Sequence, residues 1–304
     1  MINGSRRDFL QAACAGLGAT LLDRTISPDD LENTFKEIRK NLFQMINEER
    51  DVEKVPLVEM DDLATEVATK HAVDLVSNVF IGHWGSDGLK PYHRYSAAGG
   101  THATEENVSA ADGTWSNKAK DLKQDSAYLH VRMYQEKPPN DGHRRTILAP
   151  QHTHVGIGLA VQDLRLRLVE LFVAKYVDVK PIKREAKPGA QLSFSGKIVR
   201  QGYLFNNIEV FYEPLPTRPE LEWLRQPRSY ALPKESRVLK PRVQPPFTYM
   251  DGTVGIVEVY ADKSFQTPVS LYKDKPGIYT IVVWLRTVKS RTAFPATAVC
   301  IKAL

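Results

Sequence analysis

The chain has 304 residues, of which 42% are hydrophobic and 25% are charged, and its formal net charge is +5. This is the composition of a globular protein, and the length suits two domains better than one. No uninterrupted apolar run is long enough to cross a bilayer as a helix, so no transmembrane segment is expected.

The first 26 residues have the layout of an export signal. Two adjacent arginines, Arg6 and Arg7, precede a short run of small and apolar residues in MINGSRRDFLQAACAGLGATLL. This order predicts a twin-arginine signal in residues 1–26 and a periplasmic or extracellular location. The alternative is an accidental arginine pair ahead of a short helix.

The two cysteines limit the covalent chemistry. Cys14 lies inside the expected signal, so Cys300 would be the only cysteine of the exported chain, and no intramolecular disulfide would form. The apolar neighbours of Cys300 in FPATAVCIKAL predict a buried, unreactive thiol rather than a nucleophile.

The next part of the chain predicts helices packed on an antiparallel sheet. Helical spacing of apolar residues predicts helices over 27–51 and 60–77, and the first of them opens with Ser-Pro-Asp-Asp, a helix-start pattern. Residues 80–125 read as irregular, and a third helix is expected over 125–136, ended by two prolines. The β-branched and apolar segments HTHVGIGLAVQ and LRLVELFVAKYV then predict a hairpin.

The second half of the chain reads as a separate β-domain. Residues 179–190 resemble a linker, and strand-like segments recur across residues 191–304 without a long helical period. From residue 179 onward there are 20 Lys and Arg against 10 Asp and Glu, so this half is basic. An anionic envelope polymer is a candidate partner, although the charge also serves solubility. Aromatic and basic residues do not interleave as in nucleic-acid binders, so nucleic acid is not expected.

Two polar stretches of the first domain stand out. One is IGHWGSDGLKPYHRYSAAGGTHATEENVSA, which holds His83 and Glu106, and the other is EKPPNDGHRRTILAPQHTHVGIG, which holds Glu136 and His143. The pattern of GHWGSDG, then EEN, then GHRR with a downstream VGIG strand resembles the bacterial, SCP-like branch of the CAP superfamily. That superfamily comprises cysteine-rich secretory proteins, antigen 5 proteins and pathogenesis-related proteins. The resemblance covers roughly residues 31–178.

This resemblance implies a fold and a site. The fold implied by the resemblance is a CAP-type α-β-α sandwich over residues 27–178. The strand-like segments of residues 191–304 separately predict an immunoglobulin-like β-sandwich, and the two domains together make an α+β protein. The site would be a cleft containing two histidines, His83 and His143, and two glutamates, Glu106 and Glu136. The family has Gly before its Glu-Asn pair, whereas Glu105 stands there in this chain.

Such a cleft has coherent chemistry. Neutral imidazoles are common metal ligands, and a site with only two of them would bind a divalent ion, most plausibly zinc, weakly and with open positions. The carboxylates could ligate the ion, orient an imidazole or accept a proton from bound water. A hydrogen-bonded cluster that braces two loops is the alternative. His71, on the apolar face of the second helix, is either a core histidine or a residue that backs the cleft.

Three roles follow, and the residues leave open whether the protein is an enzyme. In the first, the domain is a non-catalytic module that binds a divalent metal or an extended extracellular peptide, glycan or lipid. In the second, it is a metal-assisted hydrolase of peptide or cell-wall material, with Glu106 or Glu136 as the base. No HExxH motif supports the hydrolase, so it ranks second. In the third, the protein is purely structural or adhesive.

Overall fold

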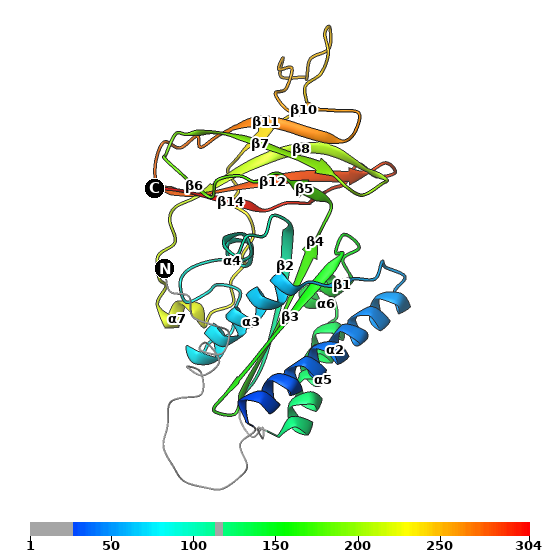
Figure 1. Cartoon of the computed structure of the whole chain (residues 1–304), viewed down its shortest axis with the longest axis vertical. Coiled ribbons are helices and arrows are strands. Elements are labelled where there is room, and N and C mark those ends of the chain that lie inside the picture. Colours follow the sequence, from blue (N-terminus) through cyan, green and yellow to red (C-terminus); the bar gives the residue numbers. More distant parts are fainter. Residues whose placement is uncertain (1–26, 113–117) are drawn as a thin grey trace.

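The computed structural model describes residues 27–112 and 118–304, so the expected signal in residues 1–26 lies outside the described residues. Two domains follow each other along the chain (Figure 1). The N-terminal domain is built on one sheet with helices on both faces, and the C-terminal domain is built on two sheets. Within the described ranges, no helix is both long and apolar enough to span a membrane.

The N-terminal sheet has the strand order β1-β3-β4-β2. Its strands are β1 (Glu59–Met60), β2 (Ala103–Asp112), β3 (His154–Gln162) and β4 (Arg165–Ala174). The expected hairpin is confirmed as β3 and β4, which pair antiparallel. Strand β2 corrects the prediction of an irregular stretch over 80–125. It pairs only with β4 and forms an edge of the sheet, and its sequence ATEENVSAAD is too polar to display a strand pattern.

Helices cover both faces of this sheet. They are α2 (Pro28–Val52), α3 (Asp62–Ser77), α4 (Pro91–Ala97), α5 (Ala119–Tyr134) and α6 (Gly142–Leu148). Apolar residues of α2, α5 and α6 share one core with β3 and β4, whereas α3 shares a second core with the opposite face of the same strands. The α-β-α arrangement expected from the sequence is therefore confirmed. Ser27 caps α2 as its sequence predicts, because its hydroxyl accepts a hydrogen bond from the Asp30 amide.

The helices near the polar stretches differ from the prediction. Helix α5 begins at Ala119, six residues before the expected start, and ends at Tyr134. Helices α4 and α6 lie where only loops were expected. Each of them has seven residues, which is too short to display an apolar period. His143 therefore stands on the first turn of a helix and not on a bare turn.

The two glycines of the VGIG segment in β3 lie against the backbone of α3. A Cβ atom added to Gly156 would lie 2.2 Å from the carbonyl carbon of Ala64, and one added to Gly158 would lie 2.1 Å from that of Ala68. Both contacts are to the backbone of α3, which cannot move away cheaply. Only glycine at these positions lets α3 lie this close to the sheet.

The C-terminal domain consists of two sheets around a common core. One sheet has the order β10-β11-β7-β5 and the other β6-β14-β12-β8-β9, with β13 beside β12. The strands are β5 (Val177–Val179), β6 (Glu185–Ala186), β7 (Gln191–Ile198), β8 (Tyr203–Glu213), β9 (Ser236–Leu239), β10 (Glu258–Val259), β11 (Ser264–Ser270), β12 (Gly277–Thr287), β13 (Ala293–Pro295) and β14 (Val299–Ala303). Residues 179–190, which read as a linker, include β6 and so contribute to a sheet. The immunoglobulin-like topology stays a prediction.

A long excursion connects the neighbouring strands β8 and β9. Residues 214–235 leave the C-terminal domain, run along the N-terminal domain and carry the short helix α7 (Leu221–Leu224) before they return (Figure 1). Leu224 of this helix is buried in the core that α3 forms with the sheet. The two domains are therefore joined both by the chain between them and by the packing of this excursion against the N-terminal domain.

Candidate functional site

The first histidine–glutamate pair lies on the α3 and α4 side of the sheet. His83 Nδ1 is 3.0 Å from Glu106 Oε1, and Arg94 contacts the other carboxylate oxygen at 2.6 Å. Arg94 also donates a hydrogen bond of 2.9 Å to the carbonyl of His83, so it holds both members of the pair. The side chain of Glu106 is only 1% exposed, which places this carboxylate inside the protein.

The charges around Glu106 keep it ionised. Burial by itself would raise its pKa, but Arg94 and the nearby imidazoles outweigh burial and lower the pKa to about 2. The carboxylate is therefore an acceptor, and the Nδ1–H of His83 donates to it. A carboxylate of such low pKa is a weak base, so this position is suited to orienting His83 rather than to removing protons.

His71 lies directly behind this pair. Its Nε2 is 2.9 Å from the carbonyl oxygen of Gly82 and 3.8 Å from Glu106 Oε1. Burial, with Arg94 nearby, lowers the pKa of His71 to about 4, so the ring is neutral at pH 7 and Nε2–H donates to Gly82. The structure thus places His71 both in the core and against the backbone that precedes His83.

The second pair lies on the opposite, α5 and α6 side. Glu136 follows α5, and its two oxygens accept from the backbone amide of His143 at 2.9 Å and from His143 Nδ1 at 2.5 Å. The carboxylate therefore holds both the ring and the first turn of α6. This pair is more accessible than the first one, since the side chains of His143 and Glu136 are 34% and 25% exposed.

The Glu106-Asn107 motif joins the two pairs. Successive residues of a strand point to opposite faces, so Glu106 contacts His83 on one side while Asn107 points to the other. Asn107 is fully buried, and its Nδ2 donates to the carbonyl oxygen of His143 at 3.1 Å. The two polar stretches of the sequence therefore meet at β2. The four residues that the sequence predicted form two separate pairs on the two faces of this strand.

A buried ionic network beyond Asn107 escaped the sequence analysis. His130 on α5 contacts Glu170 on β4 at 2.6 Å and Glu49 on α2 at 3.0 Å, and Glu170 also lies 3.4 Å from Asn107 Nδ2. Burial opposes the charge on His130, but the two carboxylates raise its pKa to about 10. One signal was available, because a lone glutamate in the apolar strand LRLVELFVA requires a buried partner.

The histidines meet one requirement of a metal site. In each pair Glu binds Nδ1, and among the described residues nothing bonds Nε2 of either ring. Carboxylate-oriented imidazoles with a free Nε2 are typical of metal ligands. However, the described ranges contain no group of three or more His, Cys, Asp or Glu side chains arranged to hold a metal ion. Each pair therefore offers one imidazole nitrogen to an ion, whose remaining positions would stay open.

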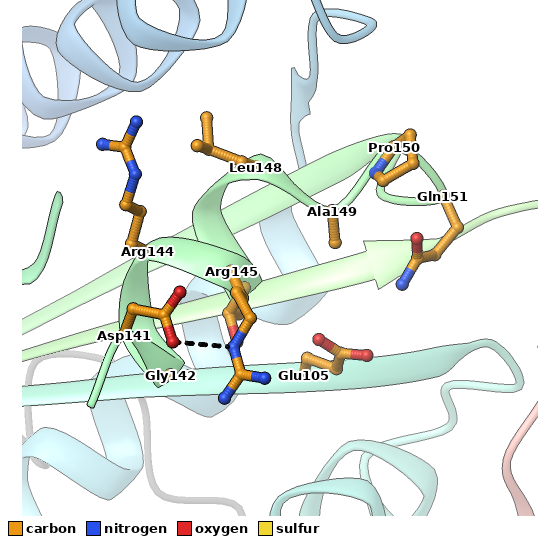
Figure 2. Close-up of a pocket in the computed structure, with 10 residues that line it drawn as sticks. Glu105, Asp141, Gly142, Arg144, Arg145, Leu148, Ala149, Pro150 and Gln151 are labelled. Carbon is orange, nitrogen blue, oxygen red and sulfur yellow. Dashed lines mark ion pairs between the residues drawn. The ribbon is translucent and has the colours of Figure 1, made fainter. Parts of the chain in front are cut away.

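A cavity of about 550 Å³ lies beside α6 (Figure 2). Figure 2 shows Arg145 turned to Asp141, which it contacts at 3.2 Å, and Glu105 on β2. Burial raises the pKa of Glu105 despite its hydrogen bonds with Gln151 and Thr146. Glu105, which stands in place of the family's glycine, thus lines this cavity and not either pair.

A tyrosine of the C-terminal domain reaches the first pair. The ring of Tyr230 lies 4.6 Å from that of His83, and its hydroxyl accepts a hydrogen bond of 2.9 Å from the backbone amide of Glu106. This contact spans two domains and more than 120 residues, so no local pattern of the sequence indicates it.

Cys300 is not a nucleophile of the site. Burial raises the pKa of its thiol to about 11, as the apolar neighbours suggested. It lies on β14 of the C-terminal domain and contacts Thr280.

Comparisons with known proteins relate the N-terminal domain to one family. Residues 43–176 match the family model described as CAP, the cysteine-rich secretory protein family. An outer surface protein from Borrelia burgdorferi is 21% identical with a TM-score of 0.38, and the match covers 45% of this chain and 92% of that chain. An extracellular protein containing an SCP domain from Bacillus anthracis is 21% identical with a TM-score of 0.39, and the match covers 50% of this chain and 45% of that chain. No curated protein matches the chain.

Residues 43–176 of this chain are therefore a CAP domain. The histidines, the glutamates and the edge strand described above all lie inside that range, whereas Tyr230 lies outside it.

Proposed function

We propose that this chain is an exported, non-catalytic binding protein. In this proposal, the two histidine–glutamate pairs of its CAP domain bind a divalent metal ion, an extended extracellular ligand, or both. The observation that carries it is that Nδ1 of His83 and of His143 is held by a carboxylate, while residues 27–112 and 118–304 supply no bonding partner for either Nε2. Export is supported by the arginine pair of residues 6–7 and by the secretory character of the family.

The electrostatics favour binding over hydrolysis. A metal-assisted hydrolase needs a base whose pKa lies near the working pH. Glu106 has a pKa of about 2 and is committed to Arg94 and His83, while Glu136 is committed to the ring and the backbone amide of His143. A bound divalent ion would act as a Lewis acid, but the described carboxylates are engaged in positioning the imidazoles.

Calorimetric titration of zinc into the metal-stripped chain lacking residues 1–26 tests this proposal. The wild type is expected to bind weakly and the variant His83→Ala/His143→Ala not at all, since two imidazoles supply the only ligands we assign. The control His154→Ala removes a partly exposed histidine that bonds Thr153 instead. Zinc binding that persists in the double variant would refute the metal assignment, and turnover of peptide or cell-wall substrates that requires His143 would establish the hydrolase.

The basic C-terminal domain is proposed to hold the protein on an anionic envelope polymer. Its excess of Lys and Arg from residue 179 onward supports this. Retention of the full chain on dextran sulfate should weaken steeply as salt rises from about 50 to about 200 mM, because the Debye length falls by about half over this range. Retention that does not depend on salt would contradict a charge-based attachment.

A further inference from the structure

The excursion between β8 and β9 lies on the CAP domain instead of closing a hairpin. We call residues 214–231 of it the strap. The strap directly follows Glu213, the last residue of β8, and the carboxylate of Glu213 is bound by three residues of the CAP domain. Lys90 donates to it, the Tyr92 hydroxyl donates at 2.8 Å, and His93 Nε2 lies at 3.2 Å. Burial opposes the charge on Glu213, but His93 and Lys90 lower its pKa to about 2, so the entry of the strap is fixed by an ionic contact.

The middle of the strap is packed against the CAP domain. Leu224 is only 4% exposed and shares the core of α3, and the ring of Trp223 meets Trp84 edge-on at 5.3 Å. A Cβ atom added to Gly88 would lie 2.4 Å from the carbonyl oxygen of Thr217, so the two backbones approach as closely as glycine allows. Aromatic and apolar anchors of this kind dominate the affinity of protein interfaces.

The end of the strap is recognised through its main chain. Trp84 Nε1 donates to the carbonyl oxygen of Ser229 at 3.1 Å, and Lys90 Nζ donates to that of Ala231 at 3.2 Å. The residue between these two carbonyls is Tyr230, whose hydroxyl accepts from the Glu106 amide on the open edge of β2 while its ring lies against His83. The CAP domain therefore binds two peptide carbonyls and the aromatic side chain that they flank.

We propose that the strap-binding surface, formed by His83, Trp84, Gly88, Lys90 and the β2 edge at Glu106, is a polypeptide-binding site that the chain occupies with its own strap. Its external partner is an extended polypeptide that presents an aromatic side chain where Tyr230 lies. The inference rests on the proposed binding role of the site and names the class of its extended ligand. Polypeptide is the class favoured because the contacts flanking Tyr230 are made to main-chain carbonyls.

Because the strap occupies the site, an external peptide can bind only when the strap leaves it. A tethered segment acts at an effective concentration on the order of millimolar, so it excludes external peptides of similar intrinsic affinity. Loss of the strap anchors removes this competition and raises the apparent affinity for an added peptide.

The test uses the full chain and a fluorescent synthetic peptide of residues 214–231 as the probe. The variant Trp223→Ser/Tyr230→Ser removes two anchors of the strap and leaves the Leu224 side chain unaltered, so that the strap can exchange with added peptide, and circular dichroism and the thermal midpoint establish that the variant folds. Fluorescence anisotropy should show that the peptide binds this variant at least about tenfold more tightly than the wild type. A matched variant, Phe247→Ala, changes an aromatic residue that is 70% exposed and should bind the peptide as the wild type does.

Two further measurements keep the proposal open to refutation if the double variant is unstable. A peptide in which the residue corresponding to Tyr230 is alanine should bind at least about tenfold more weakly than the native peptide. Excess native peptide should also displace the strap of the wild-type chain and speed tryptic cleavage after Arg225 and Arg228. Equal affinity for the two peptides, or cleavage that excess peptide leaves unchanged, would overturn the proposal. Binding of soluble peptidoglycan fragments by the folded variant without peptide binding would overturn it as well.

The outcomes separate this inference from the metal assignment. Peptide binding with no zinc binding leaves the polypeptide site standing and removes the metal. Zinc binding with no peptide binding to the folded variant does the reverse. Failure of both would refute the binding role proposed for the CAP domain.

Discussion

The two histidine–glutamate pairs use the same residue types in opposite environments. The Glu106 side chain is 1% exposed, ion-paired with Arg94 and covered by Tyr230, whereas the Glu136 side chain is 25% exposed and its bonds stay within the His143 turn. The covered pair therefore contributes mainly to the stability of the fold, whereas the exposed pair is the one that solvent can reach. The covered pair holds two domains together through β2, and the exposed pair remains available to solvent.

The largest effect should follow removal of the cation beside the covered carboxylate. Arg94→Met leaves Glu106 buried without a compensating charge, which is expected to lower the free energy of unfolding by about 3–5 kcal/mol. Urea denaturation at pH 7 measures this. The control Arg145→Met breaks the contact with Asp141, where Arg145 is 72% exposed, and should cost less than about 0.5 kcal/mol. Equal losses in the two variants would show that the burial of Glu106 does not matter.

Acid should lower the free energy of unfolding, because His71 behind the covered pair is buried without its proton. Burial lowers its folded-state pKa to about 4 from an unfolded value of 6.5, so between these values the unfolded chain binds a proton that the folded chain excludes. Stability is therefore lost as the pH falls from 6.5 to 4, by up to about 3 kcal/mol from this residue. Urea denaturation of wild type and His71→Gln across this range should give a flatter pH profile for the variant. Parallel profiles would contradict the assignment.

The link between the two pairs should contribute a smaller amount. Asn107→Ala removes the donor to the His143 carbonyl and leaves a buried acceptor without its partner, at an expected cost of about 1–3 kcal/mol. Asn206→Ala serves as the control in urea denaturation, because this asparagine bonds only its neighbour Asn207 on β8 and its loss should cost less than about 1 kcal/mol. If the two substitutions lower the free energy of unfolding equally, the hydrogen bond from Asn107 to His143 does not contribute to stability.

The smallest effect on stability is expected at the exposed pair. Glu136→Gln keeps an acceptor near His143 and changes a carboxylate that water already screens, so the free energy of unfolding should fall by less than about 1 kcal/mol. The matched change Glu106→Gln breaks a buried ion pair with Arg94 and should cost several times more. Thermal denaturation of both variants compares them directly, and a reversed order would invalidate the distinction between covered and exposed pairs.

Much of the fold was predictable because its signals are local. The spacing of Leu31, Phe35 and Ile38 indicates α2, and the apolar strand segments indicate the β3–β4 hairpin, since each depends on neighbours within a few residues. Strand β2 was not predictable in this way. An edge strand needs few β-branched residues, and its identity comes from pairing with β4, which follows more than 50 residues later.

The candidate site was predictable only as a set of residues. Similarity to a family named His83, His143, Glu106 and Glu136, but no local pattern shows that each glutamate holds a different histidine. No pattern of the sequence singles out Arg94, because its importance comes from the buried Glu106 carboxylate that it meets only in the folded chain.

Periodicity and short motifs were sufficient for the three longer helices α2, α3 and α5, for the hairpin and for the CAP family, because apolar spacing and turn residues act between near neighbours. The division into a covered and an exposed pair arose only on folding. It depends on which face of β2 each side chain takes, on the charge of Arg94 beside the buried Glu106 carboxylate, and on a strap that brings Tyr230 to the Glu106 backbone from the other domain. Those interactions have no local signature, because distance and burial, and not sequence separation, determine their strength.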